Sequence, residues 1–357
     1  MTDTIQVGAW IDGPHPGKDA ASLDRWATSI VKDAGVTRPI IVTNAGVEPI
    51  HLSRWQPEHL RNATAALRDA GAEEVGWMIW PIATRKGVGE TIADMAKAIG
   101  GAGGRYEDPA KIPDFFDIDA EGRANAHGWG PAGAQFADYL CDNLAAVLAH
   151  YEGRYLSVTC IPFKHQIRLQ DAALLKHAAV RTAELQAYSQ YHGPGHWSAD
   201  PYFRPGPIQR GTWKRWSPLL EEGHLDALIF GMANYNQQHP TGPTGIDAMR
   251  FAAQTATDLG VRRFCYWSWK HMRGSSQTHQ ARRAFLRELA ATPCPDLAEV
   301  PTQPPDAPQG FSFADALDLL IFGDGEYRAM TRVGCTIRAE DTAADDWQLI
   351  RPVGGES

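Results

Sequence analysis

The 357-residue sequence has little of what marks several large classes of protein. Its five cysteines lie far apart, with neither the close spacing of a zinc site nor the even count of a disulfide framework, so we expect reduced, structural thiols. No apolar run is long enough to cross a bilayer, which argues against membrane insertion. The net charge is -8 and basic residues form no run, so nucleic acid is not an expected partner.

Signals for export and for common cofactors are also missing. The first residues, Met-Thr-Asp-Thr-Ile-Gln, lack the basic region and apolar stretch of a secretion signal. We therefore expect a protein made in the cytoplasm without a signal peptide, which acts at a cell wall after release or as part of a phage particle. His192 and His196 flank Gly-Pro-Gly, which rules out a helical metal-binding face, so we expect no metal and no cofactor.

What the sequence does contain is a regular alternation of strand-like and helix-like segments. Segments 135–152 and 247–259 carry apolar residues at helical spacing. Eight apolar, β-rich runs are predicted as strands: 6–12, 38–44, 74–81, 114–121, 154–162, 184–191, 225–235 and 262–270. Eight such units predict an α/β fold, a (β/α)8 TIM barrel. A doubly wound open sheet is the alternative, but no Gly-rich phosphate loop follows the first strand.

Composition divides the chain into three segments. Residues 1–291 contain all eight strand and helix units and are predicted to form the barrel. Residues 292–309 are rich in proline, which breaks helices and favours extended chain, and are predicted to be a linker. Residues 310–357 are predicted to form a small α+β accessory domain, too small to be very stable unless it docks or oligomerises.

The fourth predicted strand, 114–121, reads Asp-Phe-Phe-Asp-Ile-Asp-Ala-Glu. Because side chains alternate along a strand, Asp117, Asp119 and Glu121 share one face, and apolar residues share the other. Carboxylates are costly to bury and repel one another, so this pattern indicates a chemical role. A solvated edge strand, or acids paired with arginines, would give the same pattern.

The other candidate residues lie at the ends of predicted strands, where the active sites of such barrels are found. Aromatic side chains there can stack on sugar rings while amides and acids bind the hydroxyl groups. Any one of the twelve tryptophans is best explained as core, but several near the same end favour a carbohydrate ligand. The candidates for substrate binding are Asp12, Trp80, Tyr188, Gln190, Tyr191, Asn236, Trp267 and Trp269.

The acidic string Asp114-x-x-Asp117-x-Asp119-x-Glu121 resembles the signature of glycoside hydrolase family 18, the chitinases and endo-β-N-acetylglucosaminidases. The resemblance implies that Glu121 is the general acid, that Asp119 orients the substrate's N-acetyl group, and that Asp117 supports Asp119 from beneath. It also implies cleavage with retention, in which the acetamido oxygen of the substrate is the nucleophile.

The sequence departs from that signature at several positions. Phe115 replaces the usual glycine, and Ala120 replaces the usual tryptophan. The family's Met-x-Tyr-Asp has only an approximate counterpart in residues 232–236, with one extra residue and Asn236 in place of Asp. Tyr235, or else Tyr188, is therefore the candidate for positioning the acetamido group.

The chain is similar to family 25 lysozymes as well, which have an Asp at the end of the first strand and Asp-x-Glu on the fourth. Asp12 and Asp119-Ala120-Glu121 match this arrangement. Both families attack N-acetylated polysaccharides. We therefore expect a glycoside hydrolase acting on peptidoglycan or a chitin-like polymer, as a phage endolysin does; the alternative is a non-catalytic glycan-binding or virion structural protein with a hydrolase-like barrel.

The C-terminal segment has a resemblance of its own. Residues 311–320, Tyr327-Arg328 and residues 343–347 resemble a small phage-associated domain of the Thoeris anti-defence type, whose members sequester cyclic nucleotide-like signals. A packing or oligomerisation module is the alternative. The resemblance implies an origin in a phage or prophage, with phage virion proteins as further partners.

Overall fold

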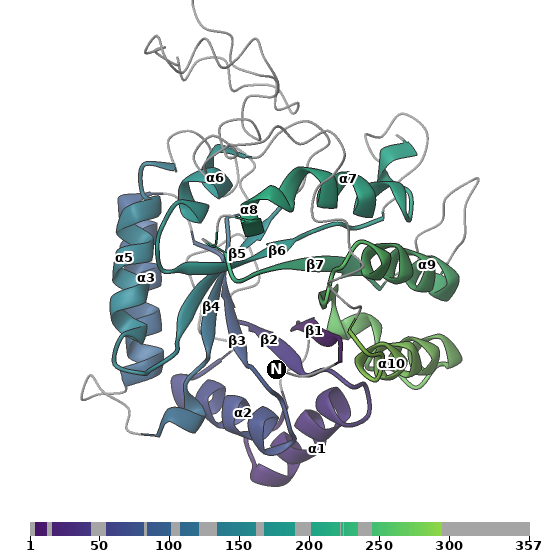
Figure 1. Cartoon of the computed structure of the whole chain (residues 1–357). Coiled ribbons are helices and arrows are strands. Elements are labelled where there is room, and N and C mark those ends of the chain that lie inside the picture. Colours follow the sequence, from purple (N-terminus) through teal and green to yellow (C-terminus); the bar gives the residue numbers. More distant parts are fainter. Residues whose placement is uncertain are drawn as a thin grey trace, which may run out of the picture.

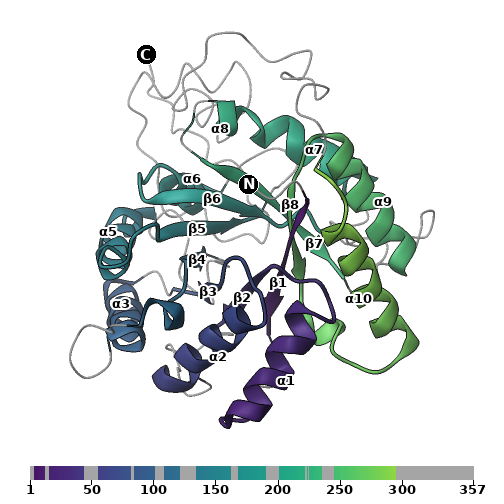
Figure 2. The ribbon, with the colours of Figure 1, turned by 60° about the horizontal axis from the view of Figure 1, so that its bottom comes forward.

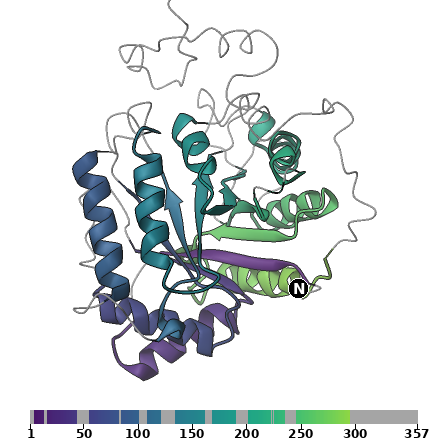
Figure 3. The same ribbon diagram turned by 60° about the vertical axis from the view of Figure 1, so that its left-hand side comes forward.

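The computed structural model describes residues 4–12, 16–43, 55–81, 84–100, 108–120, 134–161, 168–189, 201–221, 223, 225–234 and 245–294. Eight parallel strands pair in sequence order and close into a barrel. Helices surround the strands on the outside (Figures 1 and 3). The predicted (β/α)8 TIM barrel is thus confirmed, whereas the predicted domain 310–357 lies outside the described residues.

The strands are short and the helices vary in length. The strands are β1 (Gln6–Ile11), β2 (Arg38–Val42), β3 (Gly76–Ile79), β4 (Phe115–Asp119), β5 (Tyr155–Cys160), β6 (Val180–Leu185), β7 (Ala227–Ala233) and β8 (Arg263–Trp267). The helices are α1 (Ala20–Val31), α2 (Pro57–Asp69), α3 (Arg85–Gly100), α5 (Ala137–Leu148), α6 (Leu169–Leu175), α7 (Pro207–Trp216), α8 (Pro218–Glu221), α9 (Gly245–Asp258) and α10 (Gln277–Ala290). Three 3-10 turns are η2 (Pro109–Lys111), η4 (Pro201–Phe203) and η5 (Trp269–His271).

The strand predictions agree with these bounds except at the sixth strand. There the predicted run 184–191 overlaps β6 by two residues only, so its start is wrong. The exposed Arg181 interrupts the apolar pattern in the first half of β6. The apolar residues that follow Leu185 belong to an irregular segment, in which Gln186 N still donates to the Cys160 carbonyl at 2.8 Å.

The two faces of each strand build two separate cores. Outward-facing residues pack beneath the helices, as Ile118 and Val158 do. Inward-facing residues fill the barrel, among them Trp10, Phe115 and Tyr155. Gly76 on β3 leaves room for the aromatic ring of Phe115 on β4, because a Cβ atom on Gly76 would lie 2.3 Å from that ring.

Helix starts follow ordinary capping rules. Asp19 caps α1 by accepting a hydrogen bond from the Ser22 backbone N–H at 2.9 Å, and Ser276 caps α10 through His279 N at 3.3 Å. Pro57 opens α2, where its missing N–H costs nothing. Among the described residues, none of the helices has the combination of length and apolarity needed to cross a bilayer.

The residues just before β1 are hydrogen-bonded to those just after α10. Ile5 N donates to the Thr292 carbonyl at 3.0 Å, and Thr4 forms an antiparallel bridge with Pro293. Residues 292–293, at the start of the predicted linker, thereby join the first strand to the segment that follows α10. In Figure 2, α1 lies below β1 and α10 lies to its right.

Candidate active site

The acidic face of β4 points into the barrel. Asp117 and Asp119 are both buried, and Asp119 is the last residue of the strand. Because alternate residues share a face, the two carboxylates are stacked about 6–7 Å apart along β4, at its carboxyl end. Glu121 lies outside the described residues, so its position on the same face stays a prediction.

Asp117 is held by two neutral donors. The indole Nε1 of Trp10 donates to Oδ2 at 3.0 Å, and the Thr159 hydroxyl lies 2.9 Å from each carboxylate oxygen. Burial raises the pKa of Asp117, and the hydrogen bonds from Trp10 and Thr159 oppose part of that rise. With both oxygens engaged, Asp117 is suited to supporting its neighbours rather than to reacting with a substrate.

Asp119 lies close to a buried arginine that the sequence did not single out. Arg168 binds Asp171 through two hydrogen bonds of 2.7 Å each. Burial alone would lower the pKa of Arg168, but the negative charges of Asp171 and then Asp119 raise it above its usual value. Gln170 Nε2 donates to the Ala120 carbonyl at 3.4 Å. The start of α6 therefore fixes the end of β4.

Asp12 lies just after β1 in an ion pair. Its Oδ2 is 3.2 Å from Lys270 Nζ, and its Oδ1 accepts a hydrogen bond from the Lys270 backbone N–H at 3.4 Å. The same ammonium lies 5.9 Å from the centre of the Trp267 ring. Asp12 and Trp267, both predicted site residues, are therefore linked through one lysine between the first and last strands.

Three aromatic rings meet inside the barrel. The Trp10 ring centre is 5.8 Å from that of Trp267 and 6.4 Å from that of Tyr188. Since Trp10 also binds Asp117, the structure brings together Asp117, Tyr188 and Trp267 around a tryptophan that was not predicted as a site residue. Strand alternation could have found it, because Trp10 is two residues before Asp12. Trp80 is half-buried just after β3.

Trp269 does not lie with Trp267 inside the barrel. Trp269 is buried among the residues of the outer core, and it lines a cavity on the flank of the barrel with residues of α1 and α10. Regular strand structure ends at Trp267, and η5 begins at Trp269. The alternation that would have put both rings on one face therefore stops between them.

Asp114, the first acid of the string, is structural. Its carboxylate accepts from the Val75 backbone N–H at 2.7 Å, lies 2.7 Å from Arg68 Nη2, and forms a second ion pair with Arg154. For this acid the arginine-paired alternative is the correct one. Asp114 precedes β4, so it lies at the opposite end of the strand from Asp119.

Four predicted site residues besides Glu121 are not among the residues that the structure describes. Gln190, Tyr191, Tyr235 and Asn236 lie outside the described residues, so their roles stay predictions. Within the described part of the chain, no group of three or more His, Cys, Asp or Glu side chains could hold a metal ion.

Comparisons with known proteins show the fold. No family model and no curated protein matches the sequence. An endo-β-1,4-mannanase from Thermotoga petrophila is 10% identical, with 81% of this chain and 78% of that chain covered and a TM-score of 0.54. A xylanase and α-amylase inhibitor protein from Scadoxus multiflorus is 14% identical, with coverage of 79% and 98% and a TM-score of 0.50. A GH18 chitinase from Pseudoalteromonas aurantia reaches a TM-score of 0.49 at 10% identity, with coverage of 80% and 100%.

The likeness to the mannanase and to the inhibitor protein shows the barrel fold. The fold is a TIM barrel of the kind found in glycoside hydrolases and in a protein that inhibits them.

Proposed function

We propose that this chain is a glycoside hydrolase that cleaves an N-acetylated polysaccharide at the carboxyl end of its barrel strands. The observation that carries the proposal is the pair of buried carboxylates, Asp117 and Asp119, on the inward face of β4. Burying two acids on one strand is unfavourable, and barrels of this kind hold their catalytic groups at this end.

In the proposed mechanism, Glu121 protonates the glycosidic oxygen as the bond breaks. Asp119 orients the acetamido group of the substrate, whose oxygen attacks the anomeric carbon, so the configuration is retained. Asp117, locked by Trp10 and Thr159, supports Asp119. Acids stacked behind Glu121 would raise its pKa towards neutrality, as a general acid requires.

Aromatic rings would form the walls of the sugar site. Trp267 and Tyr188 meet at Trp10 inside the barrel, and Trp80 follows β3. Such faces stack on the C–H faces of pyranose rings. Tyr235, Gln190, Tyr191 and Asn236 are proposed to complete the site. Peptidoglycan is the proposed substrate because both resembled families attack N-acetylated polymers, and the resemblance of the tail suggests a phage endolysin.

The test is release of reducing ends from peptidoglycan and from chitin oligosaccharides by the full chain. Glu121→Gln should abolish release while leaving the thermal unfolding midpoint unchanged. Glu58→Gln, on the exposed side of α2, is the matched control and should behave as wild type. Wild-type rates in Glu121→Gln would refute the assignment of the general acid.

A second candidate is a glycan-binding barrel without turnover. It is favoured by the ion pair between Asp12 and Lys270, which occupies an acid that a lysozyme-like mechanism would use, and by Phe115 and Ala120 at signature positions. An inhibitor protein shares the fold. This candidate predicts saturable binding of chitin oligosaccharides by calorimetry with no product after prolonged incubation, and any turnover that depends on Glu121 would reject it.

A further inference from the structure

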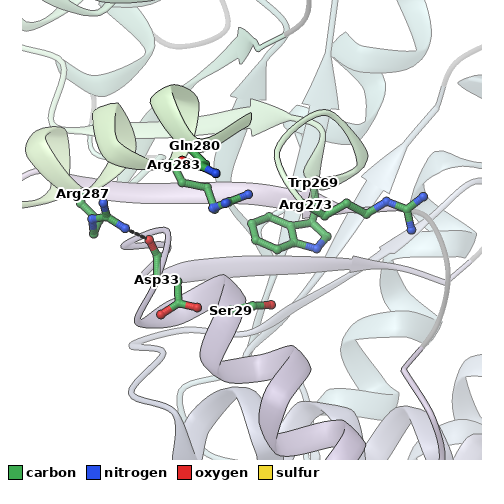
Figure 4. Close-up of a pocket in the computed structure, with 7 residues that line it drawn as sticks. All are labelled: Ser29, Asp33, Trp269, Arg273, Gln280, Arg283 and Arg287. Carbon is green, nitrogen blue, oxygen red and sulfur yellow. Dashed lines mark hydrogen bonds between the residues drawn. The ribbon is translucent and has the colours of Figure 1, made fainter. Parts of the chain in front are cut away.

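A cavity of about 400 Å³ opens on the flank of the barrel between α1 and α10 (Figure 4). Trp269 contributes one wall, and the side chains of Arg273, Arg283 and Arg287 lie around it. Asp33 is the one acidic residue in the lining. Three guanidinium groups against one carboxylate make this an electropositive hollow in a chain whose net charge is -8.

Two of the arginines are oriented by backbone carbonyls. Arg283 Nη1 donates to the carbonyls of Met272 and, at 2.8 Å, Gly274. Arg287 Nη1 donates to the Asp33 carbonyl, the bond drawn in Figure 4. A guanidinium has five N–H donors, so each of these groups is fixed in place and keeps donors for a ligand.

Arg273 is the third arginine that lines the cavity. Its backbone N–H donates to the Trp269 carbonyl at 3.1 Å, which anchors the residue beside the indole. Its side chain makes no hydrogen bond or ion pair with any residue that the structure describes. In the view of Figure 4 the indole of Trp269 lies between the guanidinium groups of Arg273 and Arg283.

Besides burial, the positive charges around the cavity also lower the pKa of a nearby histidine, His279. Burial lowers the pKa of His279, and the positive charges of Arg282, Arg283 and Arg273 lower it further. The lowered value agrees with the geometry, because a cation is disfavoured where arginines gather.

We propose that this cavity binds a small anion, a ligand carrying a carboxylate or a phosphate group. Arg283 and Arg287, on one side of the indole, bind the oxyanion, and Arg273 adds positive charge from the other side. Planar guanidinium groups suit both oxyanions, because two parallel N–H donors match two oxygens. A hollow of this volume is in the range of small-molecule sites. The site is separate from the proposed active site, since Trp269 faces outward whereas Trp267 contacts Trp10 inside the barrel.

The experiment titrates the full chain with inorganic phosphate and, separately, with glucuronate by isothermal titration calorimetry at low ionic strength. We expect saturable binding of at least one of the two, and the tighter one identifies which oxyanion the site prefers. Arg273→Gln should weaken binding about tenfold or more, and Arg273→Glu should abolish it. Arg25→Gln, exposed on α1 outside the cavity, should bind as wild type.

Absence of binding by both anions, or equal binding by Arg273→Gln and wild type, would overturn the proposal. Arg273 is chosen because its side chain supports no described contact, so its variants should fold; circular dichroism and thermal unfolding check this. Binding should also persist unchanged in Glu121→Gln. Loss of anion binding in that variant would place the anion at the barrel mouth and overturn the separate site, whatever the fate of the hydrolase proposal.

Discussion

Two groups of acids inside the same barrel are stabilised in different ways. In the Arg38 cluster (Arg38, Glu74, Glu184), one buried guanidinium lies 2.5 Å from Glu184 and 3.0 Å from Glu74. In the Asp117 cluster (Asp117, Trp10, Thr159), the carboxylate is held by neutral donors. Both groups come from inward-facing positions of the strands or from residues beside them. The first contains a buried cation that pairs with its two acids, and the second has no cation among the hydrogen-bond donors to its acid.

The contrast separates structural acids from functional ones. The Arg38 guanidinium also lies 3.9 Å from the centre of the Phe115 ring, so it is packed as well as paired. The attraction between these buried charges offsets part of the cost of removing them from water. The Asp117 cluster leaves negative charge beneath Asp119, at the carboxyl end of β4, where a general acid would benefit from it.

The largest expected effect comes from unbalancing the Arg38 cluster. Arg38→Met keeps the length of the side chain but leaves Glu184 and Glu74 buried or half-buried without their cation. We expect the free energy of unfolding to fall by about 3–5 kcal/mol. Urea denaturation at pH 7 measures it, with the exposed Arg25→Met as control. A loss below about 1 kcal/mol would show that the cluster is not a structural unit.

Asp119→Asn, in contrast, should reduce activity strongly and stability only slightly. If Asp119 orients the substrate, the rate of reducing-end release should fall about 100-fold, a barrier increase of about 2.7 kcal/mol, while the free energy of unfolding changes by less than about 1 kcal/mol. Asp24→Asn, exposed on α1, is the matched control. If stability fell as in Arg38→Met while the rate held, Asp119 would belong with the structural acids.

Thr159→Val tests the neutral donors of the Asp117 cluster. The substitution keeps the shape of the side chain but removes the hydroxyl 2.9 Å from both Asp117 oxygens, leaving Trp10 as the remaining described donor. We expect a loss of about 1–3 kcal/mol in the free energy of unfolding. Thr159→Ser retains the hydroxyl and should lose less, and equal losses in the two variants would exclude the hydrogen bond as the cause.

The barrel and the acidic face of β4 follow from the sequence because both depend on local alternation. A period of two places Asp117 and Asp119 on one face whatever surrounds them. The sequence does not predict the arginines from distant parts of the chain that interact with Asp114 and Asp119. Nothing near Asp114 in the sequence indicates that Arg68 and Arg154 neutralise it, and nothing near Asp119 indicates Arg168.

Trp269 shows a second limit of prediction from the sequence, which is that strand alternation stops where the strand ends. Alternation predicts that Trp267 and Trp269 share a face, but the rule holds only while the strand lasts, and β8 ends at Trp267. The direction of the next residues is set by η5, whose turn has no strong sequence signal. Residues just beyond a strand end are therefore the ones for which a strand pattern is least informative, and most predicted site residues of a barrel lie there.

The smallest expected effect is a dependence of stability on pH that belongs to the Arg38 cluster. Burial raises the pKa of Glu184 to about 7, although Arg38 opposes the rise. Folded Glu184 then binds a proton that the unfolded chain releases near pH 4.5, so its contribution to stability is fully present below that pH and is lost as pH rises towards 7. We expect a loss of about 1 kcal/mol per pH unit between pH 5 and 7. Glu184→Gln, which cannot titrate, should remove this slope in urea denaturation series, whereas Asp119→Asn should keep it. A slope that survives in Glu184→Gln would assign the proton to another acid and weaken the contrast between the two clusters.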